Sequence, residues 1–131
     1  MPSFVDLGLP RSIVDVLDQQ GISEPFPIQQ AAIPAVLDGR DVLGRGPTGS
    51  GKTFAFGLPM LALLAGKPSR PGRPRGLILA PTRELAAQIR QRLDEPAAAV
   101  NLRVIEVVGG VKQPLQEYAA TDPSVRLMDG R

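Results

Sequence analysis

The sequence contains no cysteine and no histidine. Their absence excludes disulfide frameworks, thiol nucleophiles, Ser-His-Asp triads, histidine general bases and zinc sites built from these two residue types. Any chemistry of this chain therefore depends on lysine, arginine, carboxylate, hydroxyl, amide or backbone groups.

Aromatic side chains and long hydrophobic runs are also scarce. Aromatic residues make up 4% of the chain, so a core must be built mainly from Ala, Leu, Val and Ile. The most apolar stretch, Phe54–Ala65, is interrupted by Gly57 and Pro59 and is too short to span a bilayer. The N-terminus carries Asp6 and lacks the basic region of a secretory signal. We therefore expect a cytoplasmic protein with no membrane partner.

Length and composition indicate one globular domain. The 131 residues suffice for one domain and are too few for two. The hydrophobic fraction of 43% and the charged fraction of 21% are typical of a chain that buries a core. The 14 glycines and 14 prolines show no collagen-like repeat, so we expect them at turns and helix ends.

Positive charge is concentrated in the middle of the chain. Residues 40–92 hold ten basic and two acidic side chains, whereas residues 1–39 hold one and five and residues 93–131 hold four and six. Such a block fits an anionic partner, phosphate or nucleic acid, and fits a solvated basic surface equally well. The loop 66–76, rich in proline, glycine and arginine, is either an electrostatic arm for nucleic acid or a soluble insertion, and the insertion is favoured.

Hydrophobic periodicity and glycine or proline positions predict helices alternating with short strands. Gly21 is expected to end the first helix in a left-handed conformation, and Pro34 to bend the second. Strand, helix, strand, helix and strand at this spacing indicate βαβ units and a parallel sheet. The predicted helices are 10–20, 28–37, 52–65 and 83–93, with a weak one at 114–120, and the predicted strands are 41–44, 77–80 and 102–108.

The segment between the first predicted strand and the third helix satisfies the phosphate-loop pattern. Its glycines let backbone N–H groups wrap a phosphate, and the following helix adds its positive end. Lys52 is suited to reach the β- and γ-phosphates, and the Thr53 hydroxyl to ligate Mg²⁺, so these two are the candidate catalytic residues. The loop comprises Gly46, Pro47, Thr48, Gly49, Ser50, Gly51, Lys52 and Thr53.

A dinucleotide-binding fingerprint is a competing interpretation of Gly44–Gly49. That interpretation needs an acidic residue about twenty positions further on to bind the ribose. No Asp or Glu occurs between Asp41 and Glu84. A variant that binds NADP through arginine stays formally open, but the Gly-Lys-Thr continuation favours the phosphate loop.

Together with this loop, three further features resemble a DEAD-box RNA helicase over about residues 3–111. Residues 21–29 look like the family's Q motif, and Phe4 lies 17 residues ahead of Gly21, where the family places an isolated aromatic residue. The resemblance implies that Gln29 reads the adenine edge, that Phe4 stacks on the base, and that Phe26 belongs to the same ATP site. A Gln amide offers one donor beside one acceptor, which matches adenine N6 and N7.

Two more segments resemble the family's RNA-binding elements. Pro81, Thr82 and Arg83 belong to a sequence similar to motif Ia, and Gly109 with Gly110 resembles the GG element. The resemblance implies contacts to the RNA backbone that do not read sequence. The residues themselves leave alternatives open: Arg83 could pair locally with Glu84 or Asp41, and the glycines could be a plain turn.

The resemblance implies an α/β fold: a partial RecA-like P-loop NTPase domain with a parallel sheet and flanking helices, truncated before the Walker B strand. Residues 1–30 would form the Q-motif region and residues 31–131 the partial ATP-binding domain. The family's Thr-Pro-Gly-Arg and Asp-Glu-Ala-Asp elements do not occur in the sequence. We therefore expect an N-terminal fragment of an ATP-dependent RNA helicase that binds ATP, Mg²⁺ and RNA but does not hydrolyse ATP by itself. Another phosphate-loop ATPase or kinase, or a non-enzymatic RNA-binding fragment, remains an alternative.

Overall fold

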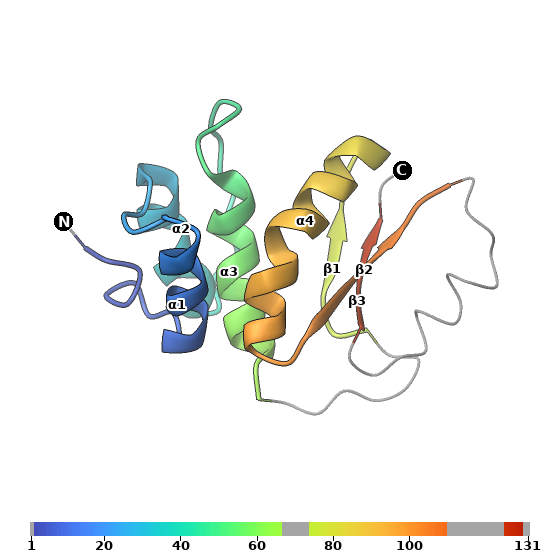
Figure 1. Ribbon diagram of the computed structural model, residues 1–131. Helices are drawn as coiled ribbons and strands as arrows, with labels where there is room; N and C mark the ends of the chain where they lie inside the picture. Colours follow the sequence, from blue (N-terminus) through green and yellow to red (C-terminus); the bar gives the residue numbers. More distant parts are fainter. Residues whose placement is uncertain (1, 67–73, 110–124, 130–131) are drawn as a thin grey trace. The chain divides into compact units, whose positions relative to one another are not determined.

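The computed structural model describes residues 2–66, 74–109 and 125–129, the last as backbone only. The chain divides into two compact units, Met1–Leu63 and Leu64–Arg131, and each is described by itself. The described elements, in chain order, are α1 (Arg11–Gln19), α2 (Pro27–Leu37), α3 (Lys52–Leu64), β1 (Leu77–Leu79), α4 (Arg83–Ala99), β2 (Arg103–Val107) and β3 (Val125–Asp129) (Figure 1).

The first unit is helical, and its three helices confirm the predicted ones to within a residue at most ends. Gly21 ends α1 with a φ of +77°, and its N–H donates to the carbonyl of Asp18. Pro34 lies inside α2 on the exposed side, where a missing backbone N–H costs least. Each helix contributes to the buried apolar set, which is Phe4, Leu7, Leu9, Ile13, Val14, Leu17, Ala32, Ile33, Phe54, Ala55, Leu58 and Leu61.

The strand predicted at 41–44 is wrong. Residues 40–47 have no regular secondary structure, and the Leu43 side chain is 86% exposed. A strand exists only through hydrogen bonds to a neighbour, and among the described strands none pairs with this segment. The segment Asp41–Gly44 therefore has apolar residues typical of a strand, but no described strand pairs with it.

The second unit contains a three-stranded parallel sheet in the order β1-β3-β2. The parallel sheet and the first two of its strands were predicted, whereas the central strand β3 was not. Leu79 and Val107 both lie opposite Asp129 in the register, so the three strands end level with one another. The helix predicted at 114–120 and most of the loop 66–76 lie outside the described residues.

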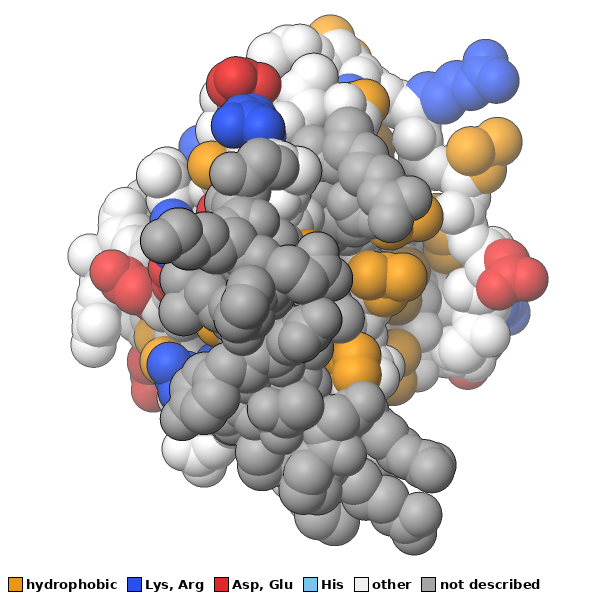
Figure 2. All heavy atoms as spheres, turned by 90° about the vertical axis from the view of Figure 1, so that its right-hand side faces the viewer, with side chains coloured by type: hydrophobic (Ala, Val, Ile, Leu, Met, Phe, Trp, Pro, Cys, Tyr) orange, Lys and Arg blue, Asp and Glu red, His pale blue; other side chains and the backbone are white. Residues whose placement is uncertain are grey.

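One face of this sheet is covered by α4, which packs on β2 and β3 and runs along the sheet in Figure 1. The continuous apolar run Leu77–Ala80 is the pattern of a strand buried in a parallel sheet, but Leu77 and Leu79 are 60% and 69% exposed. Their alternation with the half-buried Ile78 places them on one face of β1. Figure 2 shows one face of the molecule, on which hydrophobic side chains are exposed at several places.

Helix α4 continues to Ala99, six residues beyond its predicted end at Leu93. Pro96 lies inside the helix and is buried together with Leu93 and Ala97. Burying these side chains offsets the hydrogen bond that proline cannot donate. The helix ends at Ala99, and two residues later Asn101 adopts a left-handed φ of +60°.

Arg90 connects α4 to the sheet. Arg90 donates from Nε to Oε1 of Glu106 on β2 at 2.9 Å and from Nη1 to Oδ2 of Asp94 at 2.8 Å. Its side chain is 33% exposed and that of Glu106 21%, so the pair is partly shielded from water. The hydrogen bond to Glu106 is the main reason that the pKa of Arg90 lies above its ordinary value.

Replacing Arg90 by alanine is expected to lower the free energy of unfolding by about 1–2 kcal/mol. Two charge-assisted hydrogen bonds are lost, and the half-buried carboxylate of Glu106 loses its arginine partner. Urea unfolding followed by circular dichroism measures the change. Arg11→Ala is the matched control: its contact to Asp15 is 3.6 Å long and exposed, so its loss should cost almost nothing. Equal effects of the two substitutions would contradict the anchoring role of Arg90.

Candidate functional site

The glycine-rich loop before α3 is shaped by residues that carry no side chain. Gly49 and Gly51 both have a φ of +86°, a region that other residues rarely adopt. A Cβ on Gly46 would lie 2.7 Å from Oγ of Ser50, closer than real contacts allow. The N–H of Ser50 donates to the carbonyl of Pro47 at 3.1 Å and closes the turn. The loop therefore depends on glycine at three positions for its conformation or its packing.

The side chain of Gln29 fixes the end of this loop to the start of α2. Its Oε1 accepts from the N–H of Phe26 at 2.9 Å, and its Nε2 donates to the carbonyl of Gly51 at 3.1 Å. Gln29 is 3% exposed, which makes it a buried polar residue. A buried amide is stable only when its polar atoms are satisfied, so this pair of bonds is a requirement of the fold.

Gly51 is where these contacts meet. A Cβ at this position would overlap with Nε2 of Gln29 and lie 2.8 Å from Cδ2 of Phe26. The phenyl ring of Phe26, the amide of Gln29 and the last residue before α3 are therefore in direct proximity. The structure thus brings together three of the residues that the sequence assigned to one ATP site.

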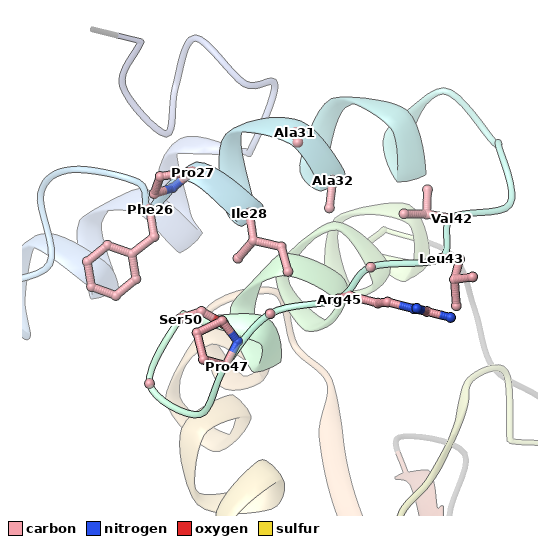
Figure 3. A pocket seen from close by; sticks show the side chains of 13 residues that line it. Phe26, Pro27, Ile28, Ala31, Ala32, Val42, Leu43, Arg45, Pro47 and Ser50 are labelled. Atoms are coloured by element: carbon pink, nitrogen blue, oxygen red, sulfur yellow. The ribbon is translucent and has the colours of Figure 1, made fainter.

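A groove with a volume of about 710 Å³ lies between α2 and the glycine-rich loop (Figure 3). One wall comes from the first turns of α2 and the other from the loop itself, and Ile28 points from the helix toward the loop in the close-up. Ile28 was not predicted as a site residue; its Cδ1 would lie 3.3 Å from a Cβ at Gly46, a tight contact, and 3.6 Å from one at Gly44, an ordinary contact. The lining residues are Phe26, Pro27, Ile28, Ala31, Ala32, Val42, Leu43, Gly44, Arg45, Gly46, Pro47, Gly49 and Ser50.

The expected stacking role of Phe4 has no support in this arrangement. Phe4 is 1% exposed, because the N-terminal segment turns back through the Leu7 N–H to Ser3 carbonyl and Leu9 N–H to Phe4 carbonyl bonds. Phe4 is therefore a core residue of the first unit in this structure, and its contact with a base stays a prediction. Phe26 is 52% exposed beside Gly51, so it is the aromatic residue of the motif that remains accessible.

The loop fits a phosphate group. Ser50 Oγ is buried without a hydrogen-bond partner among the described residues, and the glycines keep the loop free of side chains. Pro47 is a departure, since it has no backbone N–H to donate. Lys52 is exposed and Thr53 half-buried in the first turn of α3, which carries no acidic residue. Within the described ranges no group of three or more acidic side chains could hold a metal ion.

A second cluster of predicted residues lies in the other unit. Thr82 caps α4 by accepting at Oγ1 from the N–H of Leu85 at 3.1 Å, and Pro81, Thr82 and Arg83 are all exposed. Arg83 donates from Nη2 to the carbonyl of Gly109 at 2.5 Å, so its recorded partner is the GG segment and not Glu84. Gly110 lies outside the described residues.

Comparison with known proteins decides the family. The family model described as DEAD/DEAH box helicase matches residues 26–128. The chain belongs to the DEAD/DEAH box helicase family. Membership removes the alternative of a kinase or ATPase from another phosphate-loop family. In the described residues no helix is long and apolar enough to cross a membrane.

Curated relatives of this helicase chain are ATP-dependent RNA helicases. It is 44% identical over 117 residues to DEAD-box ATP-dependent RNA helicase 28 of Oryza sativa subsp. japonica, covering 89% of this chain and 15% of that protein. It is 47% identical over 110 residues to ATP-dependent RNA helicase SrmB of Escherichia coli, covering 83% of this chain and 25% of that protein. The chain thus spans a quarter or less of these two relatives. Two similar proteins of Zea mays are named chloroplastic, so the cytoplasmic location stays a prediction.

Solved structures show the same fold. The RNA helicase Prp28 from Chaetomium thermophilum, bound to ADP, has a TM-score of 0.86 and 38% identity, covering 98% of this chain and 32% of that one. A DEAD box protein from Methanococcus jannaschii has a TM-score of 0.79 and 26% identity over 98% of this chain and 34% of that one. The predicted fold class, a partial RecA-like α/β helicase domain, is confirmed.

Gly51→Ala is expected to destabilise the chain by about 1–3 kcal/mol more than Gly49→Ala. Both glycines have the same φ of +86°, so the backbone strain is shared, but a Cβ meets Gln29 and Phe26 at position 51 and nothing within 4 Å at position 49. The difference between the free energies of unfolding of the two variants, measured with urea, gives the cost of the contact between the Cβ at position 51 and the side chains of Gln29 and Phe26. Equal losses of unfolding free energy in the two variants would show that Gln29 and Phe26 do not exclude a side chain at Gly51.

Proposed function

We propose that this chain is the ATP-binding part of an RNA helicase, with the nucleotide held between the Q motif and the phosphate loop. The observation that carries the proposal is the Gln29 amide, which bonds to both segments and leaves Phe26 exposed at their junction. Residues 1–30 form the Q-motif region of this proposal, and residues 31–131 the partial ATP-binding domain.

Gln29 keeps hydrogen-bonding capacity for adenine after its two internal bonds. One of the two N–H groups on Nε2 is used by Gly51, and one of the two lone pairs on Oε1 by Phe26. The remaining donor and acceptor match the N7 and N6 positions of adenine, and guanine presents only acceptors there. Phe26 supplies an apolar surface beside the base.

The phosphates are assigned to the glycine-rich loop. Backbone N–H groups of Thr48, Gly49 and Gly51 and the start of α3 favour an anion, and exposed Lys52 adds a full positive charge. Thr53 holds Mg²⁺ through its hydroxyl in this proposal. ATP with Mg²⁺ supplies the phosphoanhydride bond whose cleavage drives helicases, and the residues of this chain bind and orient it.

RNA is assigned to the second unit. Pro81, Thr82 and Arg83 follow β1, Gly109 follows β2, and the carboxyl ends of parallel strands are where open α/β sheets bind ligands. Arg83 brings positive charge, and exposed backbone at Gly109 suits a sugar-phosphate chain without reading its bases.

Isothermal titration calorimetry tests the nucleotide site. ATP should bind, GTP should bind at least tenfold more weakly because the Gln29 amide cannot pair with its base edge, and Lys52→Ala should abolish detectable binding. Arg40→Ala serves as control, because it removes one exposed charge outside the phosphate loop. Unchanged ATP affinity in Lys52→Ala would overturn the assignment of the site.

An assay of phosphate release tests whether the chain can hydrolyse ATP. Hydrolysis in phosphate-loop enzymes requires a Walker B acid, and the sequence contains no Asp-Glu-Ala-Asp element. We expect ATP binding without turnover, with or without RNA, in a colourimetric phosphate assay of the 131-residue chain. RNA-stimulated release at ordinary helicase rates of about 1 per second or more would disprove this expectation.

A further inference from the structure

The segment Asp41–Arg45 is a stretch of backbone that pairs with no other described segment. It contains neither helix, turn nor bend, and none of its residues has a positive φ. Among the described residues, no backbone N–H or C=O group of this segment has a hydrogen-bond partner, and all five residues are exposed. These groups are therefore available to a strand from another molecule.

The side chains of this segment alternate between two faces, as they do in a strand. Val42 is 43% exposed and Leu43 86%, and the two side chains extend to opposite sides of the chain in Figure 3. A Cβ at Gly44 would lie 3.6 Å from Cδ1 of Ile28, so the face shared by Val42 and Gly44 is turned toward α2. Leu43 lies on the other face, which is turned to solvent.

The solvent face of the segment is complementary in charge to a second copy of itself. Asp41, Leu43 and Arg45 share this face, because side chains two residues apart lie on the same side of a strand. Within the described ranges neither Asp41 nor Arg45 has an ion-pair partner. Antiparallel pairing of two copies about Leu43 puts Asp41 of each copy opposite Arg45 of the other, with the two Leu43 side chains between the ion pairs.

Other ways of pairing two copies lack this match. Parallel pairing in the same register puts Asp41 beside Asp41 and Arg45 beside Arg45. Antiparallel pairing shifted by one residue puts Arg45 opposite Arg40. Because like charges directly opposite each other are destabilising, the charges select the antiparallel register about Leu43.

We propose that two copies of this chain associate through their Asp41–Arg45 segments, which pair as antiparallel strands about a two-fold axis at Leu43. The inference goes beyond the proposed nucleotide and RNA sites and does not depend on them. Five residues from each copy bury less area than the interface of a stable dimer, so the association is weak, with an expected Kd of about 10–100 µM. The exposed ion pairs add little affinity and act mainly by setting the register.

Sedimentation equilibrium of the 131-residue chain, from about 5 to about 500 µM, measures the association. Asp41→Arg and Arg45→Asp should each weaken the dimer about tenfold, because each replaces two pairs of opposite charge by two pairs of like charge. The double variant restores both ion pairs with the charges exchanged, and it should dimerise as the unmodified chain does. Asp15→Arg on α1 changes the net charge by as much as Asp41→Arg and should leave the dimer unchanged.

A cysteine cross-link tests the register. The chain has no cysteine, so Leu43→Cys introduces a single thiol. Residues directly opposite each other in an antiparallel pair lie about 4.5–5.5 Å apart at Cα, within reach of a disulfide. Mild oxidation should convert this variant to a covalent dimer, whereas Leu79→Cys, at an exposed leucine of β1, should stay monomeric.

An unmodified chain that stays monomeric up to about 500 µM would overturn the inference. Association that both single variants retain, or that the double variant fails to restore, would also overturn it, because the contact would then lie on another surface. Cross-linking of Leu79→Cys to the same extent as Leu43→Cys would assign the association to the exposed leucines of β1 instead. All substituted residues are exposed, so circular dichroism should show every variant folded.

Discussion

The first unit depends on the need to satisfy one buried amide. Gln29 lies at the start of α2 with almost no exposed surface, so its oxygen and nitrogen must find partners within the protein. They find them on Phe26 and Gly51, which brings the helix start and the end of the glycine-rich loop together. Gly51 can carry no side chain as a result. The hydrogen bonds of Gln29 thereby hold the exposed ring of Phe26 next to the loop that is proposed to bind phosphate.

The second unit uses arginine in a similar way. Arg90 links α4 to β2 through Glu106, and one end of the same helix presents Arg83 to the carbonyl of Gly109. Both bonds connect residues that are distant in sequence, and both originate on α4. The helix is thus attached to the β2 strand along its length and to the segment after that strand at its N-terminus. In both units, single side chains with several hydrogen-bonding atoms connect the segments of each proposed site.

Local signals predicted most of the helices and the phosphate loop. Gly21, the loop glycines and the start of α3 at Lys52 follow from backbone preferences that act over a few residues. Non-local features were not predictable in this way. Asp41–Gly44 has strand propensity but no paired neighbour, Val125–Asp129 became the central strand, Pro96 is tolerated because it is buried, and Phe4 became a core residue. Each of these outcomes depends on tertiary contacts that a linear pattern does not contain.

The order β1-β3-β2 also determines when this sheet can form. Among the described strands, β1 and β2 do not pair with each other, and each is hydrogen-bonded to β3, with Leu77 opposite Leu127 and Arg103 opposite Val125. During synthesis, β1 and β2 do not have this partner until Val125–Asp129 has been made, so their backbone N–H and C=O groups lack these ladder hydrogen bonds for that time. Long-range parallel pairing of this kind is slow and favours aggregation. The sheet is therefore the part of the chain for which a chaperone would matter most.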